Sequence, residues 1–336
     1  MNRYLSAAAI AVALALPAGA LESEWPGTTT SKADIVKSTQ EYLDQGDIEG
    51  LARLGDQLYL GHHYEGLFFL CEHALKRVGD PKQRALAMRG MAEAYEGMKQ
   101  WDNAIKTYKQ VIKEFPNTLE VPWAQWGIAG CLAGKGHYDE AASLLRKTVQ
   151  QWPAHDVTGL ACERLGVCYL RTGKLKEAES AIKRALDEFP VSKYPRMWGY
   201  AWVGLMRQND ALPDLYDVYL AQQRMDAAAA EFERLRNNYP DIRAPATFWL
   251  ARSLEWLGQH GRAAQEYETY ISQWPSGDYM PRALLHAGIC RWQSGDKKQG
   301  EAHWRRLCIE FAGWEPAQAR CWLEAAGLPG PKMRFR

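Results

Sequence analysis

Few residues of this chain have the types and spacing that catalysis or metal binding requires. The sequence contains no G-x-x-x-x-G-K-[ST], G-x-S-x-G, H-E-x-x-H or C-x-x-C string. Gly134-Lys135-Gly136 lacks the upstream glycine of a phosphate-binding loop, so we interpret it as a turn. His62 and His63 are adjacent, but no partner stands at ligand spacing, and a solvated turn is the better interpretation. The sequence therefore predicts no catalytic residues, no cofactor and no metal site.

Cysteines are the other reactive side chains, and there are seven of them. Five fall at interior positions of the repeated helices described below: Cys71, Cys131, Cys162, Cys168 and Cys290. Cys131, Cys168 and Cys290 occupy equivalent positions in their repeats, and such positions in neighbouring repeats lie roughly 10 Å apart, beyond the reach of a disulfide. We therefore expect the five to be small, buried core residues.

Cys308 and Cys321 differ from the other cysteines. Cys308 falls on the second helix of the last repeat, and Cys321 falls on a final helix that would pack beside it. This arrangement allows a disulfide between the two. An odd total also leaves at least one thiol that can pair only with another chain.

Charge balance and aromatic content limit the classes of partner. Lys and Arg number 41 against 40 Asp and Glu, a formal net charge of +1, so the chain lacks the basic excess of a nucleic-acid-binding protein. A hydrophobic content of 47% favours a folded core over disorder. Some of the 14 tryptophans must lie in that core, but so many also favour an aromatic-lined binding surface.

Residues 1–20 have the features of a secretory signal peptide. Arg3 precedes an apolar run from Leu5 to Leu16, which is followed by Pro17 and the small residues Ala18-Gly19-Ala20. The run is about a dozen residues long, too short to span a bilayer, which needs roughly 20. We expect cleavage after Ala20 and, because the nearest cysteine is Cys71, no lipid attachment. These features predict a periplasmic or secreted protein without a transmembrane segment, and not a lipoprotein.

An aromatic–proline pair recurs five times at repeat-like spacing: Phe115-Pro116, Trp152-Pro153, Phe189-Pro190, Tyr239-Pro240 and Trp274-Pro275. Twelve residues before each proline is an alanine: Ala104, Ala141, Ala178, Ala228 and Ala263. Eight residues before each proline is a bulky apolar residue: Tyr108, Leu145, Ile182, Phe232 and Tyr267. Seventeen residues before the proline, the residue is glycine in three of the five repeats: Gly136, Gly173 and Gly258.

Each of these residues has a physical role in a hairpin of two helices, A and B. The glycine ends helix A where the chain reverses and a positive φ is favoured. The alanine lets the two backbones approach, and the bulky residue one turn later fills the space between them. The proline cannot continue helix B and restricts the residue before it, so it ends the unit.

Two segments fit the spacing of the helix-A pattern W-x2-L-G-x2-Y: Leu51-x2-Leu54-Gly55-x2-Leu58 and Cys162-x2-Leu165-Gly166-x2-Tyr169. A third, Met88-x2-Met91-Ala92-x2-Tyr95, is close to it. With the aromatic–proline endings, this pattern resembles the tetratricopeptide repeat (TPR) over residues 48–314. Repeats begin near Ile48, Ala85, Pro122, Gly159, Ala244 and Pro281. The repeat style is similar to that of bacterial envelope TPR scaffolds of the outer-membrane assembly and Tol–Pal-associated kind. This sequence has no cysteine placed for lipid attachment, as the outer-membrane assembly kind has, and no N-terminal coiled-coil pattern, as the Tol–Pal-associated kind has.

The resemblance implies an all-α fold, a right-handed superhelical α-solenoid of about seven TPR-like hairpins. We divide the chain into a signal peptide (1–20), a lead-in segment and helix (21–46), the solenoid (47–314), a capping helix (315–328) and a basic tail (329–336). The capping helix is expected because a terminal repeat needs its apolar face covered.

One repeat, at about 191–242, breaks the spacing. Pro190 and Pro240 are 50 residues apart, whereas most steps are 37. Either this unit contains an extra helix, or its helix B is extended towards Pro213. An irregular unit rich in Trp and Tyr is either a docking place for a partner or a tolerated insertion.

In TPR arrays the concave wall is formed by fixed positions of helix A, and the resemblance carries these positions onto ten residues of this chain. They are Arg89, Glu93, Trp123, Trp126, Glu163, Arg171, Phe248, Arg252, Trp256 and Trp292. Trp and Arg are enriched where binding energy concentrates, so these residues predict an aromatic and Arg-lined groove. The alternative is that the aromatic side chains stack between repeats and the charged ones form a solvated face.

These features predict a non-enzymatic periplasmic scaffold that binds other cell-envelope proteins in this groove. The alternative is a polysaccharide- or peptidoglycan-binding module, in which exposed Trp faces stack against sugar rings. A hydrolytic enzyme is disfavoured because no acid/base pair or nucleophile arrangement stands out.

Overall fold

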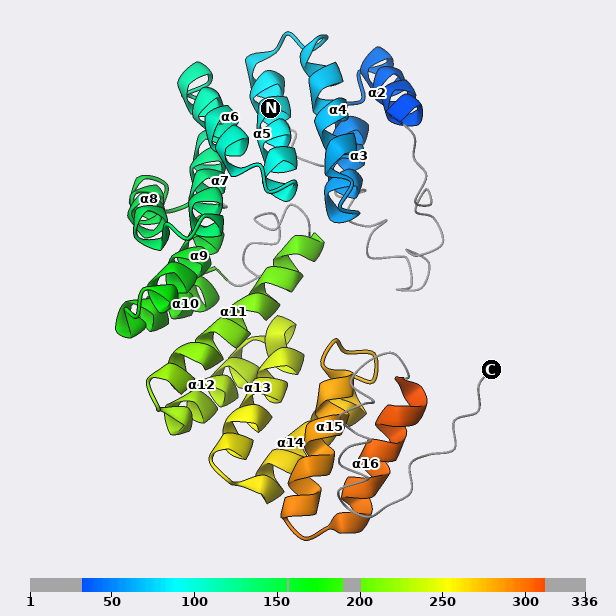
Figure 1. Ribbon diagram of the computed structural model, residues 1–336, viewed down its shortest axis with the longest axis vertical. Coiled ribbons are helices and arrows are strands. Elements are labelled where there is room, and N and C mark those ends of the chain that lie inside the picture. Colours follow the sequence, from blue (N-terminus) through cyan, green and yellow to red (C-terminus); the bar gives the residue numbers. More distant parts are fainter. Residues whose placement is uncertain (1–31, 156, 190–200, 312–336) are drawn as a thin grey trace. The chain divides into compact units, whose positions relative to one another are not determined.

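The computed structural model describes residues 32–155, 157–189 and 201–311, and in these ranges it contains helices and no strand (Figure 1). The first eight helices are α2 (Lys32–Gln45), α3 (Ile48–Leu60), α4 (Tyr64–Leu75), α5 (Pro81–Gly97), α6 (Trp101–Glu114), α7 (Glu120–Gly134), α8 (Tyr138–Gln151) and α9 (Val157–Arg171). They are followed by α10 (Leu175–Glu188), α11 (Ala201–Ala221), α12 (Met225–Asn238), the 3-10 helix η1 (Pro240–Ile242), α13 (Arg243–Trp256), α14 (His260–Gln273), α15 (Met280–Gln293) and α16 (Lys297–Glu310). Helix α2 lies within the predicted lead-in segment, residues 21–46.

Several predictions lie outside the described residues. They are the signal peptide, the capping helix at 315–328, the basic tail and Cys321. These remain predictions. Within the described ranges, no helix is both long and apolar enough to cross a membrane, and no group of three His, Cys, Asp or Glu residues could hold a metal ion.

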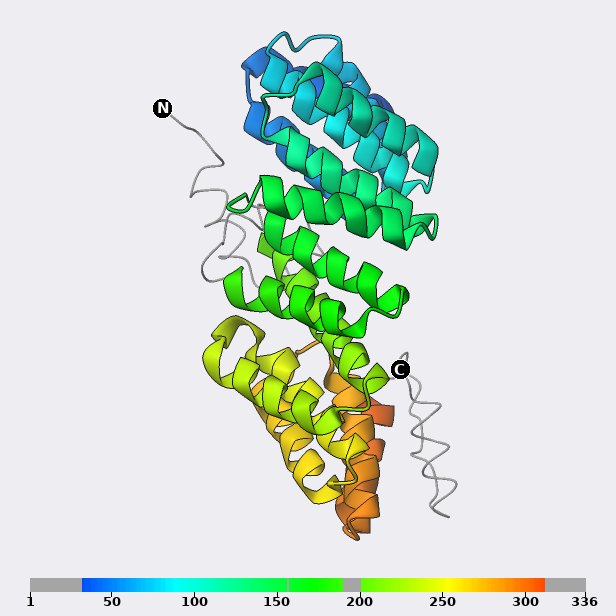
Figure 2. The ribbon, with the colours of Figure 1, turned by 90° about the vertical axis from the view of Figure 1, so that its left-hand side faces the viewer.

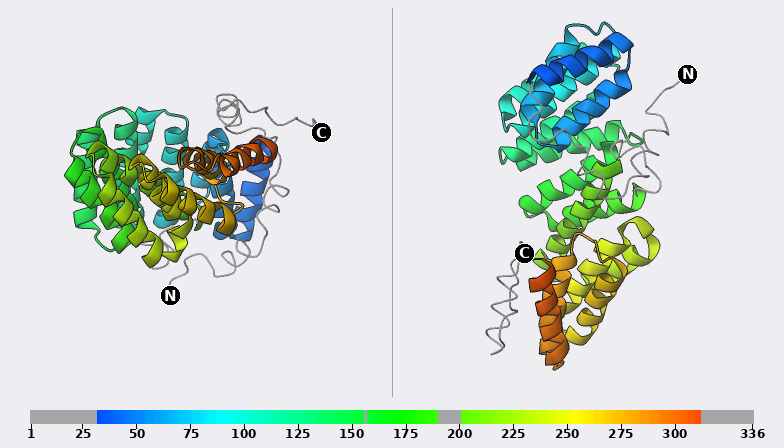
Figure 3. Two further views of the ribbon diagram at one scale, coloured as in Figure 1. Left: turned by 90° about the horizontal axis from the view of Figure 1, so that it is seen from below. Right: turned by 90° about the vertical axis from the view of Figure 1, so that its right-hand side faces the viewer.

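The chain divides into two compact units, Met1–Gly173 and Lys174–Arg336, which we call unit 1 and unit 2. In unit 1, α5, α7 and α9 are successive A helices that contact one another, and α6 and α8 are the B helices that alternate with them (Figure 2). In unit 2, each helix from α12 to α16 packs on the next, with η1 between α12 and α13 (Figure 3). Both units are therefore built from consecutive helical hairpins.

The hairpin cores contain the residues that the repeat pattern predicts. Ala104, Ala141, Ala178, Ala228 and Ala263 are fully buried. The bulky residues four positions later are buried as well: Tyr108, Leu145, Ile182, Phe232 and Tyr267. Because the alanine adds only a methyl group, the A and B backbones can approach, and the larger side chain fills the space one turn further along.

Each of the seven A–B turns among the described residues has a residue in the left-handed region at the equivalent position. Gly136, Gly173, Gly258 and Gly295 have φ values of 83°, 73°, 72° and 96°. The same position is occupied by His62, Lys99 and Gln223, with φ values of 58°, 58° and 57°. The prediction that glycine sits here for a positive φ is confirmed. The other three turns adopt the same geometry with side chains that disfavour it.

The B helices end where the aromatic–proline pairs predict. Helices α6, α8, α10, α12 and α14 each stop one residue before the aromatic one, which caps the helix with φ between −125° and −129°. Phe311 caps α16 in the same way with φ −124°, although alanine follows it. The extended aromatic residue is thus the constant feature of the ending, and the proline that usually follows reinforces it.

The irregular repeat contains one long A helix. Helix α11 runs from Ala201 to Ala221 with Pro213 inside it. The alternative of an extra helix is not tested, because residues 190–200 lie outside the described residues. Helix B of this repeat, α12, begins at Met225, so it is not extended towards Pro213. The A helix is lengthened instead, because Leu212, Leu215 and Tyr219 are buried at helical spacing across the proline.

The five interior cysteines are buried, as predicted. Burial raises the pKa of the Cys71 and Cys131 thiols to about 12 and that of Cys168 to about 11. A thiol with so high a pKa forms little thiolate at neutral pH and is a poor nucleophile. These cysteines therefore act as small core residues.

Candidate partner-binding surface

In unit 1, A helices α5 and α7 bring together three of the predicted groove residues. Arg89 donates from Nε to Glu120 at 2.6 Å and also pairs with Glu93 one turn along α5. Its guanidinium carbon lies 5.7 Å from the centre of the Trp123 ring. The Arg89 side chain is only 11% exposed. Arg89 is thus held between two carboxylates and is not available to pair with a partner's carboxylate.

Trp126 lies between Trp123 and Arg164. The two indole rings meet edge to face at 6.0 Å, and the Arg164 guanidinium from α9 stacks over Trp126 at 3.7 Å. Arg164 also donates to the Trp126 carbonyl at 3.0 Å. Trp126 is 8% exposed. Trp123 is therefore the accessible member of the pair, and Trp126 with Arg164 joins α7 to α9.

Two glycines of α7 make room for this arrangement. A Cβ at Gly130 would clash with the Arg164 guanidinium and the Glu96 carboxylate, and one at Gly127 would clash with the Tyr108 ring. Tyr108 donates to Glu96 at 2.9 Å. Burial, together with the neighbouring carboxylate, raises the pKa of Tyr108 well above its ordinary value, so the phenol stays protonated and keeps donating.

These side chains define what we call the A-helix face of unit 1: Arg89, Glu93, Glu96, Glu120, Trp123, Trp126, Glu163 and Arg164. Four carboxylates stand against two guanidiniums, a formal charge of −2. Burial raises the pKa of Glu93 above its ordinary value, and Arg89 opposes that effect. The face therefore combines a partly exposed indole with a net negative charge.

Two further predicted residues of unit 1 lie on α9. Glu163 is partly buried beside Arg164, and Arg171 is exposed at the C-terminal end of the helix. Arg171 is eight residues beyond Glu163, so it lies past the end of the A-helix face and is not one of its residues.

In unit 2 the prediction for Phe248 is corrected. It is 1% exposed and stacks on Tyr279 with ring centres 4.5 Å apart, and Tyr267 and Tyr270 lie on its other sides. Its position in the repeat is that of Arg89, but the aromatic side chains around it enclose it in the core. Phe248 therefore packs between helices and does not line a groove.

Arg252 belongs to a polar network on α13, α14 and α15. It donates to Glu255 at 2.8 Å and contacts His286 at 2.9 Å, and Tyr267 donates to Glu255 at 2.7 Å. Burial alone would raise the pKa of Glu255, but the hydrogen bonds from His286 and Tyr267 and the charge of Arg252 hold it below its ordinary value. Arg252 is thus engaged within the protein, as Arg89 is.

The two remaining predicted residues differ in accessibility. Trp256 is 52% exposed at the C-terminal end of α13. Trp292 packs on Trp304 at 5.5 Å, and the Lys297 ammonium lies 5.2 Å from its ring centre. Trp256 is therefore the most exposed of the predicted residues in unit 2.

Sequence reasoning missed Glu96, Glu120 and Arg164. The sequence did contain a signal for Glu96. A glutamate stands 12 residues before the bulky tyrosine of helix B in two repeats, as Glu96 before Tyr108 and as Glu255 before Tyr267, and in both the tyrosine donates a hydrogen bond to the glutamate. Glu120 and Arg164 gave no such signal, since each contacts a residue of the preceding repeat.

The geometry defines a class, a repeat protein made of helical hairpins. Family models described as tetratricopeptide repeat match residues 86–118, 120–187 and 214–278.

Two solved structures show the same fold. One is a signal-transduction ATPase with a tetratricopeptide-repeat sensor from Pyrococcus horikoshii, with a TM-score of 0.58 at 14% identity over 88% of this chain and 46% of that one. The other is the C-terminal part of a TPR repeat-containing protein from Cytophaga hutchinsonii, with a TM-score of 0.52 at 15% identity over 80% and 98%. No curated protein sequence matches the chain. The chain is a tetratricopeptide-repeat protein with an all-α solenoid fold, and its fold is that of a protein–protein interaction scaffold.

Proposed function

We propose that this protein is a non-enzymatic periplasmic scaffold whose A-helix face in unit 1 binds a basic, extended or helical segment of another cell-envelope protein. One observation supports this most strongly: Trp123 stays partly exposed beside carboxylates that outnumber the guanidiniums. An accessible indole next to negative charge suits a partner that presents Lys or Arg near an apolar or aromatic side chain. Proteins of this repeat family are generally scaffolds without catalytic activity.

The net negative charge of the A-helix face favours a partner segment with positive charge. Arg89 and Arg164 are both engaged within the protein, by carboxylates and by Trp126, so they do not invite an acidic ligand. Each lysine or arginine of a partner that approaches Glu93 or Glu120 gains favourable energy, and this attraction weakens with salt. Association should therefore slow and weaken as ionic strength rises.

The polysaccharide alternative has one observation in its favour, the 52% exposure of Trp256. Stacking on successive sugar rings needs several open indole faces. Trp126 is covered by Arg164, and Trp292 is packed against Trp304. A protein partner therefore accounts better for the arrangement.

The proposed location follows from the sequence of residues 1–20, where a basic start, an apolar run and Ala18-Gly19-Ala20 have the order of a cleaved export signal. N-terminal sequencing of the protein purified from the envelope fraction should begin at Leu21. A protein that retains Met1 and fractionates with the cytoplasm would contradict this part of the proposal.

The binding proposal is tested by affinity capture from the native envelope with the wild type, Trp123→Ala and Trp274→Ala. Trp274 is a partly exposed tryptophan of unit 2 that caps α14, so it serves as the matched control. Trp123→Ala should lose at least one protein that the wild type and the control both retain. If all three capture the same proteins, the A-helix face is not the binding surface.

A further inference from the structure

Unit 1 has a second surface, on the opposite side of α5, that the proposed function does not use. Arg84, Met88, Met91 and Tyr95 follow one another at steps of four, three and four residues, so they share one face of α5. At 100° per residue that face lies roughly 150° around the helix from Arg89 and Glu93. The surface formed by these four residues is therefore separate from the A-helix face.

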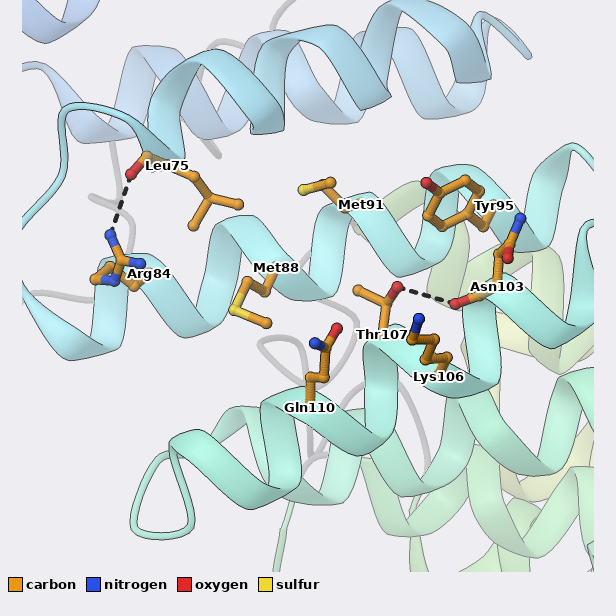
Figure 4. Close-up of a pocket in the computed structure, with 9 residues that line it drawn as sticks. All are labelled: Leu75, Arg84, Met88, Met91, Tyr95, Asn103, Lys106, Thr107 and Gln110. Atoms are coloured by element: carbon orange, nitrogen blue, oxygen red, sulfur yellow. Dashed lines mark hydrogen bonds between the residues drawn. The ribbon is translucent and has the colours of Figure 1, made fainter.

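A groove of about 320 Å³ opens along this face of α5, between α4 and α6 (Figure 4). Met88 and Met91 form its apolar floor, and Lys106 and Gln110 of α6 form one wall. Leu75, near the end of α4, borders the other side at one end. From Arg84 to Tyr95 the helix rises about 16 Å, the length of three helical turns.

Helix α6 places three lysines in and beside this groove. Lys106, Lys109 and Lys113 are exposed and follow one another at helical spacing. Within the described ranges none of the three forms an ion pair. Of the three, Lys106 lines the groove itself. All three border an adjoining shallow cavity of about 420 Å³ along α6, together with Asp102 and Ile105.

The nearby carboxylates do not neutralise these lysines. Asp102 accepts from Lys135 at 2.6 Å, and Glu72 of α4 lies 3.9 Å from Lys76. Glu114 follows Lys113 directly, so it points about 100° away around the helix. The groove thus has an apolar floor, with Lys106 on its α6 wall and Lys109 and Lys113 in the adjoining cavity.

We propose that this groove docks an acidic amphipathic helix of about three turns from a partner protein. Flexible, polarisable methionines adapt to the apolar side chains of a docked helix. The three lysines complement carboxylates along one flank of that helix and fix which way it lies. The segment chosen here is acidic, whereas the A-helix face selects a basic one, so the two surfaces recruit different partners.

The test uses the full chain and two synthetic 15-residue helical peptides with the same apolar residues. One carries Glu along its flank and the other carries Lys. Affinity is measured by fluorescence anisotropy for the wild type and for Lys106→Glu/Lys109→Glu/Lys113→Glu. The control triple variant is Lys147→Glu/Lys176→Glu/Lys298→Glu, which changes the net charge equally at exposed lysines elsewhere.

The Glu-flanked peptide should bind the wild type and lose at least about tenfold in affinity with the groove variant, but less than about twofold with the control. Met88→Ser should weaken the binding of the Glu-flanked peptide without altering how its affinity depends on salt. This single variant keeps the test decisive if the triple variant folds poorly. The Lys-flanked peptide should prefer the groove variant.

Three results would overturn the proposal. The first is equal binding of both peptides to the wild type, and the second is an equal loss in the groove and control variants. The third is binding of anionic phospholipid vesicles that the groove variant abolishes while neither peptide binds, which would make this a membrane-facing surface. The capture experiment with Trp123→Ala is independent of all three.

Discussion

Two exposed glycines of unit 2, only three residues apart, should respond to alanine with opposite signs. Gly258 lies in an A–B turn with φ 72°, and Gly261 lies in the first turn of α14. A Cβ added at either position would meet no atom within 4 Å. Neither substitution therefore creates a clash, and the backbone conformation alone decides the outcome.

The magnitudes follow from that conformation. An alanine in the left-handed region costs about 1–2 kcal/mol, so Gly258→Ala should lower the free energy of unfolding by about that amount. In a helix alanine is more favourable than glycine by roughly 0.5–1 kcal/mol, and Gly261→Ala should gain the lower part of that range. The two variants should differ by about 2 kcal/mol, or about 4–8 °C in Tm for a unit of this size.

Thermal unfolding followed by circular dichroism and calorimetry measures this difference. Hydrogen exchange of the amides around the α13–α14 turn provides a local reading that does not depend on how the two units melt. The reasoning would be refuted if Gly258→Ala were as stable as the wild type, or if both variants shifted in the same direction.

Three further predictions concern charge, thiols and close packing. Burial alone would raise the pKa of Glu268, but hydrogen bonds from Arg291 and His303 lower it to about 2. The stability that the Glu268 carboxylate contributes is therefore present above pH 4.5 and is lost as the pH falls through 2. The stability difference between the wild type and Glu268→Gln should therefore shrink over that interval in urea titrations. The Cys131 thiol, with a pKa of about 12, should resist iodoacetamide at pH 8 in the native protein and react once urea unfolds it, as peptide mass spectrometry would show. Gly127→Ala should lower the free energy of unfolding by about 1–3 kcal/mol, because its Cβ overlaps the buried ring of Tyr108, and a neutral result would contradict the packing described at this site.

The hairpin core was predictable because its determinants are local. Ala263 and Tyr267 are four residues apart on α14, and both are buried where α14 packs on α13, so a short repeat pattern predicts their burial. The same holds for the turn position of Gly173, whose positive φ follows from the reversal of the chain.

The surface was harder to predict because accessibility depends on neighbouring repeats. Phe248 and Trp256 both occupy positions that face the groove in TPR arrays, yet one is enclosed by Tyr279 and the other is open to solvent. Arg89 is neutralised by Glu120, which lies 31 residues later. The helix-A rule contains no information about such contacts, and the prediction of an Arg-lined groove therefore missed the acidic character of the face.

The path of α11 shows a third kind of limit. Pro213 is a signal to end a helix, and the alternative of an extended helix B treated it as one. Buried residues on both sides, Leu212 and Leu215, keep the helix continuous across it. Tertiary packing overrides the local preference of Pro213 to end a helix. A repeat pattern contains no information about that packing, so it does not predict the continuous helix.

Photo-crosslinking in cells from position 123 tests the central claim most directly. A photoreactive amino acid replaces Trp123 in the full chain, and a second version replaces Trp274. Position 123 should give an adduct with another envelope protein that mass spectrometry maps to a Lys- or Arg-rich segment, and position 274 should not. An adduct that maps to glycan or to an acidic segment, or equal crosslinking from both positions, would contradict a basic protein partner on the A-helix face.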